Sequence, residues 1–195
     1  MIKPDTIILA SGSPRRKQLL TEAGIFFTVR TRPTDESFPE DMDVYQVAEF
    51  LARKKAAAFL DELACDQLII AADTVVIHNN EILGKPSSPE EAFHMLKRLS
   101  GQTHEVITGV CLLGKNHEEH FSDRTTVSFR ILSDKQINYY LSGYNPYDKA
   151  GSYGIQEWIG LIGVEKITGS YFNVMGLPVH LIYESLRKLQ PEIYP

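Results

Sequence analysis

The segment that decides the fold is residues 7–16, which read IILASGSPRR. Its apolar run 7–10 is typical of a buried strand, and the small residues that follow break the strand. Ser13 then stands before Pro14, and a serine N-cap with proline at the first helical position predicts the start of a helix. Gly24 indicates where that helix ends. This part of the chain is therefore predicted to form one βα unit.

The loop of this βα unit carries Ser11 and the adjacent arginines Arg15 and Arg16. The N-terminus of a helix presents backbone N–H groups that favour an anion. Arginine side chains beside such a loop add positive charge and hydrogen-bond donors at the same place. We therefore expect this loop to bind an anionic ligand.

Outward from this unit, the sequence continues to alternate between strand and helix patterns. Two of the later strands are joined so briefly, across residues 114–120, that they must be antiparallel, which makes the sheet mixed. The predicted class is α/β with a mixed sheet. Further strands are expected at 25–30, 68–77, 106–113, 125–132 and 161–167, and further helices at 44–63, 89–101, 133–143 and 178–189.

The bulk composition limits the class of protein. With 195 residues, of which 43% are hydrophobic and 23% charged, the chain is expected to form a single domain over residues 1–195. Its formal net charge of −5 argues against a protein that coats nucleic acid or an anionic membrane. The first apolar run is far too short for a signal peptide or a membrane span, and no later run reaches that length. We expect a cytoplasmic protein that binds neither nucleic acid nor membrane.

Two features that resemble metal or redox motifs are interpreted as structural. The two cysteines, Cys65 and Cys111, have no partner at metal-ligand or redox spacing and are expected to be buried thiols. Residues 117–120 read HEEH, but they fall in the predicted hairpin turn, with no zinc-ligand partner nearby. We expect this stretch to be a solvated turn.

Two charged residues lie at positions where the pattern calls for apolar ones. Asp73 interrupts the apolar strand 68–77, and an ionised carboxylate there is costly unless a cation or a metal compensates it. Lys55 falls on the apolar stripe of the helix 44–63, whereas Lys54 points off it. The alternatives are a strand-end aspartate that faces water and a lysine that extends its ammonium group to solvent.

Other charged residues near strand ends and tight turns add to this pair. Asp35 and Glu36 lie in an acidic loop and offer oxygen ligands to a hard cation such as Mg²⁺, although a solvated loop is the alternative. Lys85 follows a glycine in LGKPSS, which is not a Walker A loop but can reach a phosphate. Together these side chains have the composition of a polyphosphate and metal site. Its members are Arg15, Arg16, Lys55, Lys85 and Lys149 with Asp73 and Glu36.

The chain also carries a series of motifs in a fixed order. They are LASGSPRR, LARKKA, AADTVV, GKP, LSGQTHEVITGV, YDKAGSYGIQ and GSYFNVMGLPV. In this order they closely resemble the Maf family of nucleoside triphosphate pyrophosphatases over nearly the whole chain. The resemblance implies an elongated α/β fold of the inosine triphosphate pyrophosphatase type, with two lobes around a nucleotide cleft. It also implies hydrolysis of a nucleoside triphosphate to the monophosphate and pyrophosphate, with Mg²⁺ or Mn²⁺ as cofactor.

The same resemblance implies roles for individual residues. Asp73 matches the catalytic carboxylate, as metal ligand or as proton acceptor for the attacking water, and Glu36 matches a metal-site acid. Lys55 and Lys85 match phosphate-binding lysines. Arg16 is expected on the phosphate side of the SGSPRR loop, which would wrap the nucleotide.

The family divides by substrate, and this chain resembles the dTTP/UTP pyrophosphatase subfamily. Relatives that act on 7-methyl-GTP carry Trp, Gln, His-Cys and Glu where this chain has Arg15, Thr74, Asp148-Lys149 and Gln156. An amide at Gln156 can both donate and accept, as the carbonyl and N3–H of a pyrimidine require. The alternatives are a 7-methyl-GTP pyrophosphatase and a nucleotide-binding regulator of septum formation. Modified pyrimidine nucleotides as substrates and formation of a homodimer are left open.

Overall fold

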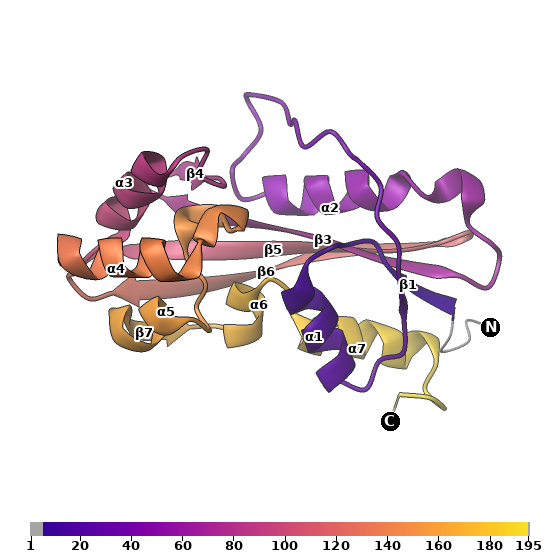
Figure 1. Ribbon diagram of the computed structural model, residues 1–195. Helices are drawn as coiled ribbons and strands as arrows, with labels where there is room; N and C mark the ends of the chain where they lie inside the picture. The colour runs from indigo at the N-terminus through magenta and orange to yellow at the C-terminus, as the bar shows by residue number, and fades with distance from the viewer. Residues whose placement is uncertain (1–5, 195) are drawn as a thin grey trace. The chain divides into compact units, whose positions relative to one another are not determined.

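The computed structural model of the protein describes residues 6–194, and Figure 1 labels its elements. The strands are β1 (Ile7–Leu9), β2 (Thr28–Val29), β3 (Leu68–His78), β4 (Glu81–Leu83), β5 (Thr103–Gly114), β6 (His117–Phe129) and β7 (Val164–Thr168). The helices are α1 (Pro14–Glu22), α2 (Val47–Ala57), α3 (Pro89–Leu99), α4 (Asp134–Tyr144), α5 (Trp158–Gly163), α6 (Tyr171–Met175) and α7 (Val179–Leu189). Residues 1–5 and 195 lie outside the described residues. The prediction that the N-terminal region contains no signal peptide therefore falls partly on residues that are not described.

The strands form one mixed sheet. Their order is β2-β1-β3-β5-β6-β7, and β4 pairs with β3 off this path. Strand β1 is parallel to both β2 and β3, whereas β4 is antiparallel to β3 and β7 is antiparallel to β6. The prediction of an α/β fold with a mixed sheet is confirmed.

The chain divides into two compact units. Unit 1 is formed by the described residues of Met1–Asp73 and Gly176–Pro195 together with Thr108–Asp123, and unit 2 by Thr74–Ile107 and Arg124–Met175. The boundary falls within strand β3, between Asp73 and Thr74. Asp73 is the last residue of a segment of unit 1, and Thr74 is the first residue of a segment of unit 2. The single domain expected over residues 1–195 stays a prediction.

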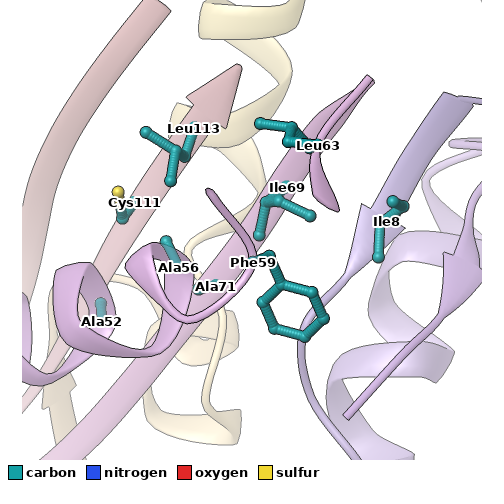
Figure 2. Close-up of a cluster of buried hydrophobic side chains, with 9 residues drawn as sticks. All are labelled: Ile8, Ala52, Ala56, Phe59, Leu63, Ile69, Ala71, Cys111 and Leu113. Carbon is teal, nitrogen blue, oxygen red and sulfur yellow. The ribbon is translucent and has the colours of Figure 1, made fainter. Parts of the chain in front are cut away.

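In unit 1, helix α2 lies along the sheet (Figure 1), and its buried residues are Val47, Ala48, Leu51, Ala52 and Ala56. Gly109 of β5 permits a close approach, because a Cβ atom there would lie 2.3 Å from the carbonyl carbon of Ala48 in α2. A cluster of buried side chains joins α2 and the turn after it to β1, β3 and β5 (Figure 2). Its members are Ile8, Ala52, Ala56, Phe59, Leu63, Ile69, Ala71, Cys111 and Leu113. The apolar stripe predicted for this helix is therefore part of the core.

The HEEH stretch, residues 117–120, begins strand β6, because the hairpin turns over residues 115–116 alone. Successive side chains of a strand point to opposite faces of the sheet. Alternate members of the stretch accordingly contact α2 on one face and α7 on the other (Figure 1). The prediction of a solvated turn is wrong, because these residues belong to a strand and pair with side chains of two helices. In the sequence, such a run of charged residues cannot be distinguished from a polar loop. The pairs are Glu118 with Arg53, His120 with Glu49 and Glu119 with Ser185, at 2.9, 2.7 and 3.0 Å.

In unit 2, helices α3 and α4 begin where the sequence predicts. The hydroxyl group of Ser88 accepts a hydrogen bond from the backbone N–H of Glu91 at 3.2 Å and caps α3. Ser133 and Gln136 form a complete capping box at the start of α4. These signals are local, so the sequence alone is enough to place them.

An aromatic group fills part of the core of unit 2. Nε2 of His104 lies 2.7 Å from the hydroxyl group of Tyr153, and Phe129 packs edge-on against both rings. Burial lowers the pKa of His104 to about 3, so this imidazole is neutral at neutral pH. His104 and Phe129 thus anchor the loop around Tyr153 through ring contacts and one hydrogen bond.

Several predicted boundaries are wrong. The helix expected over 44–63 ends at Ala57, and a 3-10 turn takes Leu60–Glu62. The strand expected over 25–30 shortens to β2, and residues 161–163 end helix α5 instead of starting a strand. Helix α6 is not predicted. Short apolar runs fit both helix and strand, and tertiary packing decides between them.

The two cysteines differ from each other. Cys111 is buried in the cluster of Figure 2, and burial raises the pKa of its thiol to about 12. Cys65 is exposed, which contradicts the expected buried thiol, because it lies in the turn before β3. Within residues 6–194, none of the helices combines the length and the apolar character that a membrane crossing requires.

Candidate active site

The hydroxyl group of Ser11 organises the SGSPRR loop. Its Oγ accepts hydrogen bonds from the backbone N–H of Ser13 and from Nη1 of Arg16, at 3.2 and 3.3 Å. Ser13 is the N-cap of α1, as predicted, yet its side chain makes no capping hydrogen bond. Ser11 therefore closes the loop in place of a conventional serine cap.

The guanidinium group of Arg16 ties this loop to two distant segments. Its Nε donates to the carbonyl of Gly176 at 2.8 Å, and its Nη1 donates to the carbonyl of Ala72 in β3 at 2.7 Å. Burial lowers the pKa of Arg16, and the nearby carboxylate of Asp73 opposes that shift. Arg16 thus holds a fixed positive charge beside the carboxyl-terminal part of β3 in unit 1.

Lys55 joins the two predicted site carboxylates. Its Nζ lies 2.7 Å from Oε1 of Glu36 and also forms an ion pair with Oδ1 of Asp73. The side chains of Lys55 and Asp73 are only 18% and 15% exposed. A lysine that extends to solvent and an aspartate that faces water do not fit this arrangement, and β3 continues well past Asp73.

Asp35, the other acid of the predicted loop, has a different set of contacts. Its Oδ2 accepts from Nζ of Lys54 at 2.7 Å, and the same ammonium group donates to the carbonyl of Ser37 at 3.1 Å. The hydrogen bonds from Lys54 and then from Ser37 hold the pKa of Asp35 well below its usual range. Consecutive acids of the loop therefore pair with consecutive lysines of α2, and the Asp35–Lys54 pair places Glu36 next to Lys55.

The carboxylates of Glu36 and Asp73 converge on one cationic atom, Nζ of Lys55. Two carboxylates that reach a common point are also what a hard cation needs, because Mg²⁺ takes one or two carboxylates and completes its shell with water and substrate phosphate. The side chains present therefore fit Mg²⁺ or Mn²⁺. Among the described residues, no group of three or more His, Cys, Asp or Glu side chains is placed to hold a metal ion.

In unit 2, a backbone hydrogen bond joins the loops that carry Lys85 and Lys149. The N–H of Gly151 donates to the carbonyl of Gly84 at 3.1 Å. Gly151 has a φ of +68° and lies against Val76, where a Cβ atom would be 3.1 Å from a methyl group. Only glycine adopts this conformation readily at such close contact. The bond brings the two lysine-bearing loops together.

The two lysines differ in burial. Lys85 is exposed. Lys149 has a side chain only 9% exposed, and its Nζ lies 2.7 Å from Oδ1 of Asp148 and 3.1 Å from Oε1 of Glu157. A buried ammonium group is stable only with such partners, so its position is well defined.

Gln156 carries an unsatisfied acceptor. Its Oε1 is buried and has no hydrogen-bond partner among the described residues. A buried polar atom of this kind costs free energy unless a ligand or a water supplies the partner. Thr74 is half-buried in β3 and belongs to the same unit.

The predicted site residues divide into one set in each unit. Arg15 lies half-buried in α1, beside the set of unit 1. In unit 1, Ser11 bonds to Arg16, and Lys55 pairs with both Glu36 and Asp73. In unit 2, a backbone hydrogen bond joins the loops of Lys85 and Lys149. Unit 1 holds Ser11, Arg15, Arg16, Glu36, Lys55 and Asp73, and unit 2 holds Thr74, Lys85, Lys149 and Gln156.

Sequence reasoning missed two residues of unit 2 that make shielded polar contacts. Glu157 pairs with Lys149 and accepts a hydrogen bond from Tyr140, and nothing in the local pattern marks it. Asn173 lies in the GSYFNVMG motif, and its buried Nδ2 donates to the carbonyl of Val106 and to Oγ1 of Thr125, at 3.0 and 2.9 Å. The motif could have drawn attention to Asn173. The contacts of Asn173 indicate a structural role, because they connect α6 to β5 and β6.

The order of the motifs and the geometry of both sets can be compared with known proteins. The family model described as Maf-like protein matches residues 6–189. The chain belongs to the Maf-like protein family. The family resemblance stated from the motifs is therefore confirmed, and the Maf motifs of this chain carry every residue of the two sets except Glu36, which lies in the loop before α2.

Several Maf relatives match nearly the full length of the chain. A protein of Bacteroides fragilis (strain ATCC 25285) is 50% identical over 94% of this chain and 95% of its own length. Proteins of Phocaeicola vulgatus and Parabacteroides distasonis are 52% and 50% identical, over 94% and 95% of this chain and 95% and 97% of their own lengths. Each of the three is named dTTP/UTP pyrophosphatase. Among solved structures, the chain is similar to the Staphylococcus aureus Ham1 protein, with a TM-score of 0.46 and 14% identity over 63% of this chain and 71% of that one.

Proposed function

We propose that this protein is a nucleoside triphosphate pyrophosphatase that hydrolyses dTTP and UTP to the monophosphate and pyrophosphate. The observation that carries the proposal is the convergence of Glu36 and Asp73 on Lys55 beside the SGSPRR loop. This arrangement places acids for a cation and a water next to cationic groups for phosphates. Maf relatives named dTTP/UTP pyrophosphatase, about half identical over nearly the whole chain, support the same reaction.

In this reaction Asp73 accepts the proton of the water that attacks the α-phosphate. Arg16 and Lys55 of unit 1 neutralise charge on the phosphates. Lys85 and Lys149 of unit 2 are the other cations that the family resemblance assigns to phosphate. A divalent cation held by Glu36 and Asp73 would polarise phosphate oxygens and lower the pKa of a bound water. Lys55 keeps the two carboxylates close to each other by pairing with both.

The unsatisfied Oε1 of Gln156 supports a pyrimidine base as the part recognised in unit 2. Uracil and thymine present N3–H as a donor between two carbonyl acceptors. An amide side chain can accept from N3–H through Oε1 and donate to a carbonyl through Nε2. A carboxylate in its place would repel both carbonyls.

Pyrophosphate release from a panel of nucleoside triphosphates, with and without a chelator, tests the proposed function. We expect kcat/KM for dTTP and UTP to exceed the values for GTP and 7-methyl-GTP, and the chelator to abolish release. A preference for 7-methyl-GTP would instead favour that subfamily, and nucleotide binding without turnover would favour a regulator. Turnover that ignores the chelator would contradict the cation. A cytoplasmic location belongs to the same proposal.

The change Gln156→Glu is expected to lower kcat/KM for dTTP by about 10-fold to 100-fold and to leave the residual GTP rate nearly unchanged. The reason is that one mismatched hydrogen-bonding edge typically costs about 1–3 kcal/mol. Adding Arg15→Trp, which offers an aromatic face to a purine, should shift the ratio further toward 7-methyl-GTP.

The measurement is kcat/KM for the four nucleotides at fixed Mg²⁺. Gln102→Glu is the matched control, because Gln102 is an exposed glutamine of the same unit. If Gln156→Glu lowers all four rates by one common factor, then Gln156 does not read the base.

A further inference from the structure

Glu157 lies at the centre of a hydrogen-bond network in unit 2 that the proposed reaction does not use directly. One carboxylate oxygen, Oε1, pairs with the buried ammonium group of Lys149 at 3.1 Å. The other, Oε2, accepts a hydrogen bond from the hydroxyl group of Tyr140. The side chain of Glu157 is 19% exposed, so these contacts are largely shielded from water. Both acceptor oxygens of the carboxylate are therefore engaged.

The hydroxyl group of Tyr140 extends this network to the backbone of the loop. It accepts a hydrogen bond from the N–H of Gly154 at 3.0 Å, and the Tyr140 side chain is fully buried. Burial and the hydrogen bond to Glu157 raise the pKa of Tyr140, which keeps the hydroxyl group protonated and able to donate. The network thus runs from Gly154 through Tyr140 to Glu157 and on to Lys149.

Gln156 lies inside the turn that this network closes. The backbone N–H of Glu157 donates to the carbonyl of Gly154 at 3.0 Å, so residues 154–157 form a hydrogen-bonded turn with Gln156 at its third position. The carboxylate of Glu157 folds back against this turn, because a Cβ atom on Gly154 would lie 2.7 Å from its carboxyl carbon. The carboxylate of Glu157 therefore acts as a support against which the turn is packed.

We propose that Glu157 is a positioning residue that fixes Gln156 in the orientation needed to select a pyrimidine base. This inference rests on the proposed function. The role requires an ionised carboxylate, because two donors, Tyr140 and Lys149, must be accepted at once. A glutamine of the same size has only one acceptor oxygen, so its amide NH₂ group would face one of the two donors.

Selectivity between bases is the readout that separates positioning from general effects. A change at Glu157 also alters the surroundings of Lys149, which is expected to contact phosphate, and every nucleotide shares that contribution. The ratio of kcat/KM for UTP to kcat/KM for GTP cancels it. A loss that appears in this ratio acts on base recognition. Because Asp148-Lys149 also differs between the subfamilies, the Gln156→Ala background decides whether the loss acts through Gln156.

The experiment measures that ratio for the wild type, Glu157→Gln, Tyr140→Phe and Glu165→Gln, with melting temperatures for each. Glu165→Gln is the matched control, because Glu165 is an exposed glutamate of the same unit. We expect Glu157→Gln and Tyr140→Phe each to lower the ratio about 10-fold, mainly through a higher KM for UTP. In a Gln156→Ala background, Glu157→Gln should change the ratio by less than about twofold, since the residue it positions is absent.

The other outcomes decide against the proposal in different ways. A wild type that prefers UTP, with an unchanged ratio in folded Glu157→Gln, overturns the positioning role and leaves the proposed function standing. An equal ratio loss in both backgrounds means that Glu157 does not act through Gln156. Loss of the fold in both Glu157→Gln and Tyr140→Phe shows a structural role and also overturns it. A wild type that releases no pyrophosphate from any nucleotide contradicts the proposed function and this inference together.

Discussion

The change Asp73→Asn is expected to lower turnover of dTTP and UTP by about 100-fold or more, the scale of a lost general base. Asparagine keeps the size of the side chain but removes the charge that would accept the proton of the attacking water. It also removes one of the two carboxylates that converge on Lys55. The fold should survive, because Lys55 keeps its ion pair with Glu36 at 2.7 Å.

Pyrophosphate release at saturating UTP checks this expectation, with circular dichroism and the melting temperature as tests of folding. Asp61→Asn is the matched control, because Asp61 is an exposed aspartate of unit 1 in the 3-10 turn after α2. That variant should keep wild-type turnover. Near-normal turnover in a folded Asp73→Asn variant would remove Asp73 from the catalytic role.

The change Gly109→Ala is expected to destabilise the protein by about 3 kcal/mol, the upper part of the usual range for overpacking. The new Cβ atom would lie 2.3 Å from both the carbonyl carbon of Ala48 and the backbone nitrogen of Glu49. Backbone atoms of a helix cannot move aside as a side chain can, so α2 would have to shift away from β5. Because Lys55 lies on α2, the same shift should also weaken its contact with Asp73 and lower turnover.

Thermal unfolding checks the effect on stability. For a chain of this size, about 3 kcal/mol corresponds to a fall in melting temperature of about 6–12 °C. Gly143→Ala is a control of opposite sign, since Gly143 lies within α4 with no atom within 4 Å of a new Cβ. Alanine in a helix is favoured over glycine by about 1 kcal/mol, so this variant should be slightly stabilised. A Gly109→Ala variant as stable as the wild type would show that the helix adjusts without strain.

Elements with local signals could be predicted from the sequence. Ser88 and Ser133 cap α3 and α4 through residues only three positions away, and both helices begin where expected. Periodicity alone predicts that Lys55 lies on the buried side of its helix, and its side chain is mostly buried. The interaction that decides each of these features lies within one or two helical turns of the residue itself.

Features that depend on distant partners could not be predicted in this way. Asp35 and Glu36 are adjacent acids of one loop, yet Asp35 pairs with Lys54, whereas Glu36 pairs with Lys55, which also pairs with Asp73 of β3. The HEEH stretch gave the wrong prediction for the same reason, because its partners lie on α2 and α7. The pattern of charges along a strand or loop does not predict which helix will pack against it.

The sequence by itself determined the mixed α/β class, the family and the chemical types of the site residues, because these depend on local patterns and on motifs in a fixed order. Only the tertiary structure decided which of these residues meet. Arg16 bonds to Gly176 across 160 positions, and Glu157 reaches Tyr140 across 17. Such contacts form only when the sheet and its helices are packed. The free energy that selects them comes from burial of the surrounding core, which no short segment of sequence contains.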